Sequence, residues 1–209
     1  GKEIKTEGVR KKKNGQKIDV SIHGFPVELS GGKTGIYAVY NDITERKKKE
    51  EKIRYLSFND ELTDLYNRRY IDTEMKRLNK SRKIPISIIV GDLDNLKYIN
   101  DNYGHSMGDK YLKNIAKIFK KVVRSEDIVG RIGGDEFTII LPNTKKNIAK
   151  NICVRIQRQC EILNQKNNLA EPLEISLGSA TLENKNGDIF KCFNEADQNM
   201  YKKKGRSSE

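Results

Sequence analysis

The sequence predicts an α+β fold in which helices pack on one mixed β-sheet. Residues 85–90 form a continuous apolar run, which is typical of a central strand buried on both faces. Residues 107–123 place their apolar side chains on one broad stripe, as in an amphipathic helix. Residues 127–131 and 137–141 flank a Gly-Gly turn and predict an antiparallel hairpin.

The first forty residues predict further β-hairpins. Apolar and polar side chains alternate over residues 18–23, as on a half-buried strand, and residues 35–40 form another strand pattern. Asn14-Gly15 and Gly31-Gly32 supply the turns. This piece is too small to close a core of its own.

A charged helix is expected to follow. Asp42 is followed three residues later by Glu45, which resembles a capping box, and residues 46–56 continue without Gly or Pro. The apolar positions are too sparse to establish a coiled coil, so the pattern indicates a connecting helix.

From residue 59 onward the predicted order is helix, strand, helix, helix, hairpin, helix, strand, helix. The last three of these elements are a helix at 147–163, a strand at 173–180 and a helix at 189–203.

Composition narrows the class of protein. The 209 residues allow one domain, or one domain plus a fragment, and no apolar run approaches the length needed to span a bilayer. Cys153, Cys160 and Cys192 have no metal-like spacing, which favours reduced thiols in the cytoplasm. The net charge of +12 lies largely in short lysine and arginine runs without a nucleic-acid-binding motif. We therefore expect no nucleic acid and no membrane contact in this segment, although the full-length protein could be attached to a membrane upstream.

Acidic residues at two places predict a metal site. Asp92 ends the buried strand, where a carboxylate needs a charged partner, and Asp135 and Glu136 lie on a hairpin that could pair beside it. The preceding glycines allow backbone geometry that other residues avoid. Mg²⁺ takes such hard oxygen ligands together with substrate phosphates. The alternative, for Asp92 and for Asp94, is a cap on the following helix.

Neighbouring polar residues suit a nucleotide. Lys97 can direct an ammonium at phosphates. Asn100 offers a donor and an acceptor, and Asp109 offers acceptors, which matches the edge of guanine. A plain turn at residues 100–104 explains Asn100 nearly as well.

Three stretches of the sequence resemble motifs of the GGDEF family, the diguanylate cyclases, and they occur in the family's order and at its spacing. They are residues 60–69 (DELTDLYNRR), 92–109 (DLDNLKYINDNYGHSMGD) and 131–137 (RIGGDEF). The likeness runs from residue 59 to about residue 204. Residues 1–45 resemble the C-terminal part of a PAS sensor domain, which closes with Asp-Ile-Thr-Glu-Arg, and residues 46–58 would be a linker helix before the cyclase domain at 59–209. Since the half of a PAS domain that usually lines the ligand pocket is missing, we expect the sequence to come from a longer, bacterial protein.

The resemblance implies a ferredoxin-like palm related to nucleotidyl cyclases, and the condensation of two GTP into cyclic di-GMP with release of two pyrophosphates. One domain holds one GTP, so a homodimer is implied for catalysis. The resemblance also assigns roles to individual residues. It implies that Mg²⁺, or Mn²⁺ in its place, is bound by Asp92, the Leu93 carbonyl and Asp135, and that Glu136 accepts the proton of the attacking hydroxyl or holds a second cation. The substrate phosphates would be held by Lys97 and Lys204, and the rest of the substrate would be bound by Asn95, Leu96, Asn100 and Asp109, of which the last two contact guanine.

The resemblance also implies product inhibition by cyclic di-GMP. Arg124 and Asp127 match the family's Arg-x-x-Asp motif ahead of the signature, and Arg155 falls where a second arginine joins that site. Guanidinium groups suit phosphate and the guanine edge. The chain departs from the family at its end, where the tail after Tyr201 is shorter, so Lys204 fits but Arg206 is displaced or realigned.

Two other functions remain open from the sequence. A catalytically inactive GTP or cyclic di-GMP receptor would show damaged signature residues, whereas all of them are present here: Asp92, Lys97, Asp135 and Glu136. A cyclase that makes a mixed GMP–AMP product is disfavoured by Asp109, the carboxylate expected of guanine readers.

Overall fold

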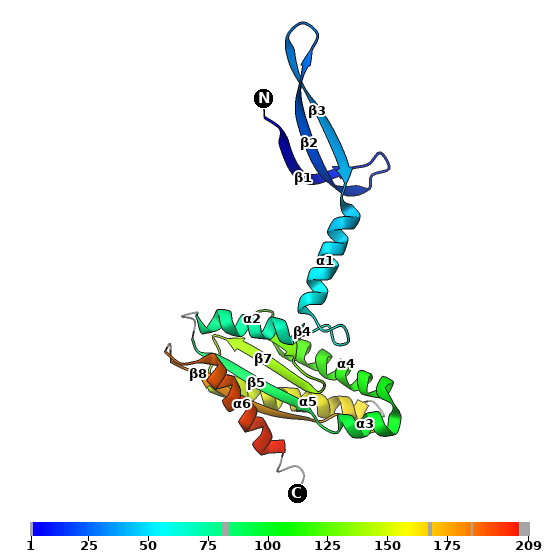
Figure 1. The fold of residues 1–209 in the computed structure, drawn as a ribbon. Helices are drawn as coiled ribbons and strands as arrows, with labels where there is room; N and C mark the ends of the chain where they lie inside the picture. The colour runs from blue at the N-terminus through cyan, green and yellow to red at the C-terminus, as the bar shows by residue number, and fades with distance from the viewer. Residues whose placement is uncertain (1, 81–83, 167–168, 185, 205–209) are drawn as a thin grey trace. The chain divides into compact units, whose positions relative to one another are not determined.

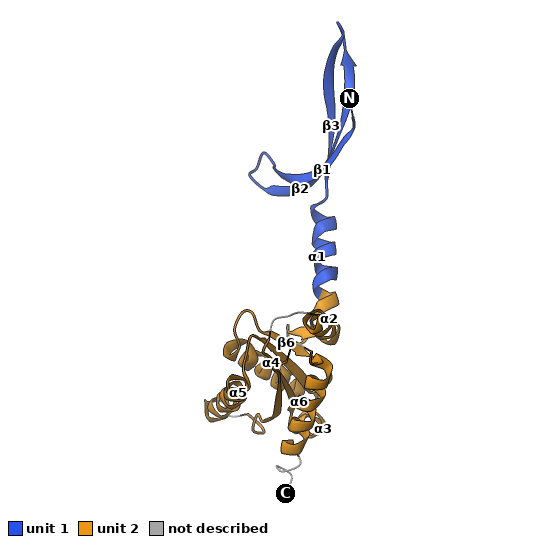
Figure 2. Cartoon of the chain, turned by 90° about the vertical axis from the view of Figure 1, so that its left-hand side faces the viewer, with its two compact units in different colours: residues 1–55 blue, residues 56–209 orange. Residues whose placement is uncertain are grey.

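The computed structural model describes residues 2–80, 84–166, 169–184 and 186–204. The chain divides into two compact units, residues 1–55 and residues 56–209 (Figure 2). Each unit is described by itself.

Unit 1 holds a three-stranded antiparallel sheet in the order β1-β2-β3. Its strands are β1 (Ile4–Lys11), β2 (Lys17–Leu29) and β3 (Lys33–Asp42). Gly15, Gly31 and Gly32 adopt positive φ in the two turns, which only glycine does at little cost. The predicted hairpins are confirmed, while the PAS resemblance stays a prediction.

Helix α1 (Thr44–Phe58) begins where the cap was expected. The Asp42 carboxylate accepts the backbone N–H of Thr44 at 3.0 Å, which satisfies one of the free donors of the first turn.

Unit 2 is built on a five-stranded sheet in the order β4-β6-β7-β5-β8 (Figure 1). Strand β4 pairs parallel with β6 and the other pairs are antiparallel, so the sheet is mixed, as predicted. In chain order the elements are β4 (Tyr66–Asn67), α2 (Arg68–Asn79), β5 (Ile86–Leu93), α3 (Leu96–Tyr103), α4 (His105–Val122), β6 (Ile128–Arg131), β7 (Glu136–Pro142), α5 (Lys146–Lys166), β8 (Ile175–Leu182) and α6 (Ile189–Lys204).

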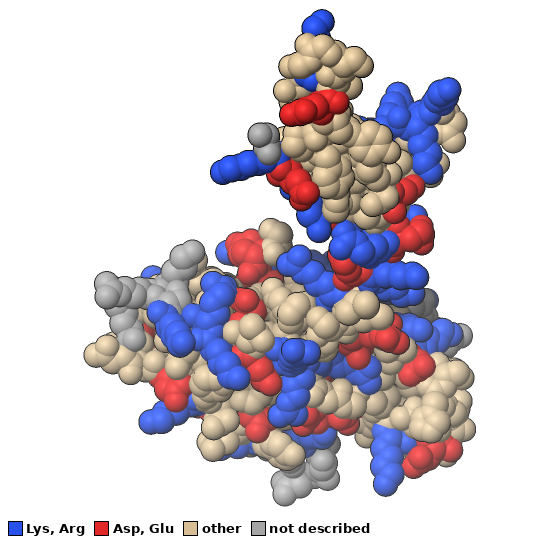
Figure 3. All heavy atoms as spheres, turned by 45° about the horizontal axis from the view of Figure 1, so that its top comes forward, with Lys and Arg blue, Asp and Glu red and all other residues tan. Residues whose placement is uncertain are grey.

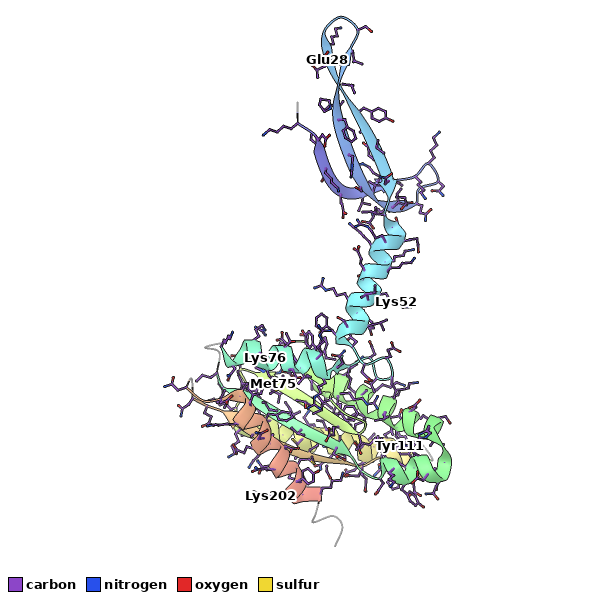
Figure 4. All side chains as sticks on the ribbon, in the orientation of Figure 1. Glu28, Lys52, Met75, Lys76, Tyr111 and Lys202 are labelled. Atoms are coloured by element: carbon purple, nitrogen blue, oxygen red, sulfur yellow. The ribbon has the colours of Figure 1, made fainter. Side chains whose placement is uncertain are left out.

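Helices cover both faces of this sheet (Figure 1). One core cluster joins α2 and α6 to side chains such as Ile88 and Val90 of β5. The other joins α3, α4 and α5 to Ile89 and Leu93, which alternate with them along the strand. On α2, Met75 points toward the sheet and Lys76 away from it (Figure 4). Strand β5 is buried along its whole length, as its continuous apolar run predicts.

The observed elements differ from the expected ones chiefly at their ends. Strand β8 begins two residues later than predicted and continues to Leu182. The edge strand β4 has two residues, which is too short for any apolar periodicity, so the sequence did not predict it.

None of the described helices combines the length and the apolarity that crossing a membrane requires. On the face shown in Figure 3, lysine and arginine side chains lie among acidic ones rather than in one continuous patch.

Candidate functional site

The end of β5 meets the turn between β6 and β7. Asp92 pairs with Glu136 in the antiparallel register, and the Leu93 N–H donates to the carbonyl of Asp135 at 3.0 Å. The structure therefore brings together the two pairs of residues that were assigned to the metal and the proton transfer, although more than forty positions of the chain separate one pair from the other. The pairs are Asp92 with Leu93 and Asp135 with Glu136.

Asp92 lies in surroundings that disfavour an isolated negative charge. The residue is 9% exposed. Burial raises its pKa, a hydrogen bond from Lys204 opposes the rise, and the negative charges of Asp135 and Asp197 add to it. A cation at this carboxylate would remove the repulsion between the acids.

Lys204 supplies one such cation. It is the last residue of α6, and its Nζ lies 2.5 Å from Oδ1 of Asp92. The sequence placed Lys204 at the phosphates, and it had no signal for this ion pair. Arg206, whose place in the family pattern was uncertain, lies outside the described residues.

Asp94 has a different partner. The Ser176 hydroxyl lies 2.9 Å from Oδ1 and 3.2 Å from Oδ2 of Asp94, and burial raises the pKa of this carboxyl. The residue at the N-cap of α3 is instead Asn95, in a left-handed conformation with φ of 59°. Ser176 comes from the neighbouring strand β8, and no sequence pattern pointed to it.

The donor set suits a cation that is shared with substrate. In the described part of the chain, no three His, Cys, Asp or Glu side chains come close enough together to hold a metal. The candidate set is two carboxylates, Asp92 and Asp135, with the Leu93 carbonyl. Mg²⁺ is bound in this way, through one or two carboxylates with phosphates and water completing its shell.

Arg131 holds the signature turn in place. Its Nε and Nη2 donate to the carbonyl of Gly134 at 3.1 and 2.7 Å, and its Nη1 donates to Asp60 at 3.2 Å. Asp60 also accepts the N–H and hydroxyl of Thr63 at 2.9 and 2.6 Å. Burial alone would raise the pKa of Asp60, but these bonds and the Arg131 charge hold it below its usual value. The motif that contains Asp60 supported the family resemblance, but the sequence assigned Asp60 and Arg131 no role.

The glycines of the turn provide space rather than unusual backbone angles. Neither Gly133 nor Gly134 is among the positive-φ residues, so the expectation of a special backbone geometry is wrong. A Cβ on Gly133 would lie 2.5 Å from Oε2 and 3.2 Å from Cδ of Glu136, whereas one on Gly134 would meet nothing within 4 Å. Gly133 thus leaves room for the Glu136 side chain, and Gly134 faces open space.

The two proposed guanine readers lie together at the junction of α3 and α4. A Cβ on Gly108 would lie 3.0 Å from Cγ of Asn100, so the Asn100 amide occupies the space that this glycine leaves, and Asp109 is the next residue of α4. Lys97 is exposed on the first turn of α3. At the start of the same helix Asn95 is exposed, whereas Leu96 is buried.

The residues of the predicted inhibitory site surround the turn after α4. Asp127 accepts the backbone N–H of Arg124 at 2.8 Å, and burial raises the Asp127 pKa. Arg155 of α5 donates to the carbonyl of Val122 at 3.1 Å, so its guanidinium lies at the end of α4. A cavity of about 480 Å³ opens here, lined in part by Arg124, Asp127 and Lys120.

Comparison with protein families gives a match over most of the chain. Residues 57–209 match the model described as "Diguanylate cyclase, GGDEF domain". This range includes every residue of the candidate site.

Individual proteins are also similar. A diguanylate cyclase from Vibrio cholerae is 34% identical over 187 residues, which are 87% of this chain and 57% of that protein. Diguanylate cyclase DgcM of Escherichia coli is 32% identical over 201 residues, 94% of this chain and 48% of that protein. The chain thus spans about half the length of these curated relatives. The coiled coil and GGDEF domain of DgcB from Caulobacter crescentus, solved in complex with c-di-GMP, superposes with a TM-score of 0.71 at 23% identity, covering 78% of this chain and 88% of that one.

Proposed function

Because this chain belongs to the GGDEF family of diguanylate cyclases, we propose that it condenses two GTP into cyclic di-GMP and releases two pyrophosphates. The family generally uses divalent metal ions, and we propose Mg²⁺, with Mn²⁺ as a substitute. The observation that carries this proposal is the convergence of Asp92, Asp135 and Lys204 at the end of one buried strand.

The side chains around this point suit the parts of one GTP. Asn100 and Asp109 read the guanine edge, since together they offer a donor and acceptors. Lys97 and Lys204 hold the phosphates as compact positive charges. Asn95 and Leu96 line the substrate where α3 begins.

The residues of the signature turn serve the chemistry. Asp92, the Leu93 carbonyl and Asp135 hold the cation, which when bound offsets the charge that develops on the reacting phosphate. Glu136 accepts the proton of the attacking ribose hydroxyl or holds a second cation, and Gly133 leaves the room that its side chain needs. Arg131 keeps the turn in position through its bonds to the Gly134 carbonyl.

We further propose that the protein acts as a homodimer and is inhibited by its product. One domain holds one GTP, so two domains must face each other to join two nucleotides. Arg124, Asp127 and Arg155 would bind cyclic di-GMP, and DgcB was solved with this nucleotide. In the same proposal residues 1–45 belong to a PAS domain and residues 46–58 are its linker to the cyclase domain at 59–209.

The function can be tested with the purified 209-residue chain. Incubation with GTP and Mg²⁺ should yield cyclic di-GMP and pyrophosphate in a 1:2 ratio, as the reaction requires. A folded, dimeric protein that binds GTP and forms neither product would contradict the enzyme proposal and favour a receptor. A mixture of GTP and ATP tests the base preference.

A further inference from the structure

Lys204 places a positive charge of the chain itself on a carboxylate that the cation also needs. Its Nζ lies 2.5 Å from Oδ1 of Asp92, and the two side chains are 38% and 12% exposed. At this distance the ammonium occupies the position from which a cation would contact the same oxygen.

The ammonium form of Lys204 is favoured by several acids. Partial burial acts to lower its pKa, but the hydrogen bond to Asp92 and the negative charges of Asp92, Asp94 and Asp135 outweigh this and raise it. Lys204 Nζ stands in an ion pair with Asp92, so a divalent cation at this carboxylate must displace a positive charge and overcome its repulsion.

The surroundings allow Lys204 to move. The side chain lines a cavity of about 780 Å³ that is also lined by Asp94, Ser176 and Lys203. It stands at the end of α6 on a flexible four-carbon stem. A triphosphate bound beside Asp92 would offer the ammonium several negatively charged oxygens in exchange for one carboxylate.

We propose that Lys204 competes with the divalent cation for Asp92 until a bound triphosphate draws its ammonium away, so that cation and nucleotide bind cooperatively. The inference rests on the proposed function and adds to it an order of events at the site. Because such coupling is reciprocal, each ligand should raise the affinity for the other by the same factor.

The test measures binding and needs no turnover. The affinity for Mn²⁺ is determined for the 209-residue chain from the electron paramagnetic resonance signal of free Mn²⁺, without nucleotide and with guanosine 5′-(α,β-methylene)triphosphate. The variants are Lys204→Gln, Lys204→Arg, Asp92→Asn and, as the matched control that removes one charge from the same helix end, Lys203→Gln. The coupling is the ratio of the Mn²⁺ affinities with and without the analogue, and it is compared between variants at one analogue concentration. The contribution of Mn²⁺ bound to free nucleotide is then the same for every variant and cancels.

Without nucleotide, Lys204→Gln should bind Mn²⁺ at least about 5-fold more tightly than the unchanged chain, and its coupling to the analogue should shrink by the same factor. Lys203→Gln should behave like the unchanged chain, and Lys204→Arg, which keeps the positive charge beside Asp92, should not gain Mn²⁺ affinity in the absence of nucleotide. Equal or weaker Mn²⁺ binding by Lys204→Gln, with Asp92→Asn losing it, would overturn the competition and leave the proposed function intact. If Asp92→Asn leaves Mn²⁺ binding unaltered, both the competition by Lys204 and the proposed cation site are overturned.

Discussion

Gly108→Ala should damage GTP recognition without damaging the fold. A Cβ at this position would lie 3.0 Å from Cγ of Asn100 and 3.2 Å from Cδ1 of Leu96, with the Asn100 amide oxygen closer still. Non-bonded heavy atoms settle at about 3.5–4.0 Å, and the Asn100 amide oxygen is the atom nearest to the added Cβ, so the amide has to withdraw by more than about 1 Å. Because a displacement of about 1 Å at a positioning group can cost ~10²-fold, we expect the KM for GTP to rise about 10- to 100-fold.

The stability of the variant separates this effect from unfolding. Gly108 lies inside helix α4, where alanine is favoured over glycine by about 0.5–1 kcal/mol. The atoms that would clash belong to side chains rather than to the backbone. The melting temperature should therefore hold or rise while recognition weakens.

Initial rates over a range of GTP concentrations, together with thermal unfolding, measure both effects. Asn100→Ala completes a double-mutant cycle, since it removes the amide through which Gly108→Ala is expected to act. In the Asn100→Ala background, Gly108→Ala should add little to the KM. Fully additive effects, or an unchanged KM in the single Gly108→Ala variant, would refute the reasoning.

Four other changes test the site and its support. Asp60→Asn should lower the free energy of unfolding by about 1–2 kcal/mol and reduce turnover, because Arg131 loses a charged partner. The pKa of Asp60 is lowered from 3.8, so the contribution of its carboxylate to the free energy of unfolding is present above pH 3.8 and is lost as the pH falls through the lowered pKa. Below pH 3.8 the unchanged chain should therefore lose stability more steeply than Asp60→Asn, and parallel curves of stability against pH would argue against the ion pair. Asp135→Asn should abolish formation of cyclic di-GMP in a folded protein, and undiminished turnover would remove this carboxylate from the cation site. Arg124→Ala should relieve inhibition by added cyclic di-GMP with little loss of initial rate, whereas unchanged inhibition would reject the regulatory site. Thr138→Val should stabilise the protein by about 1 kcal/mol in chemical denaturation, since Oγ1 of Thr138 is a buried atom without a hydrogen-bond partner in the described structure; a loss of stability would indicate a partner.

The sequence predicts those parts of the molecule whose information is local. The apolar run of β5, the stripe of α4 and the glycine turns of unit 1 each specify their element without reference to distant residues. The approach of Asp92 to the signature turn was also predictable, because a hairpin beside a buried strand brings the end of one to the start of the other. The bounds shift by a few residues because tertiary contacts decide where an element ends.

Side-chain pairs between distant segments were not predictable. The bonds of Ser176 to Asp94, of Arg131 to Asp60 and of Lys204 to Asp92 join residues 82, 71 and 112 positions apart. None leaves a periodic or spacing signal, because each depends on the packing of β8, α6 or the loop before β4 against the sheet. Sequence reasoning therefore found the acids of the site and Lys204, but not the ion pairs and hydrogen bonds that hold or neutralise those acids.

Asp92 shows how this fold supports its chemistry. Seven other residues of β5 are buried beside it, so the strand lies in the core and the carboxylate near its end is largely shielded from water. Burial and the charges of Asp135 and Asp197 raise the Asp92 pKa, so the fold itself does not favour the ionised form. A rigid, partly desolvated carboxylate is stabilised strongly by a cation that brings its own ligands, because water screens the attraction between carboxylate and cation only weakly at a partly buried site. The burial and the neighbouring charges that raise the Asp92 pKa are thus features that the proposed binding of a cation together with a nucleotide would exploit.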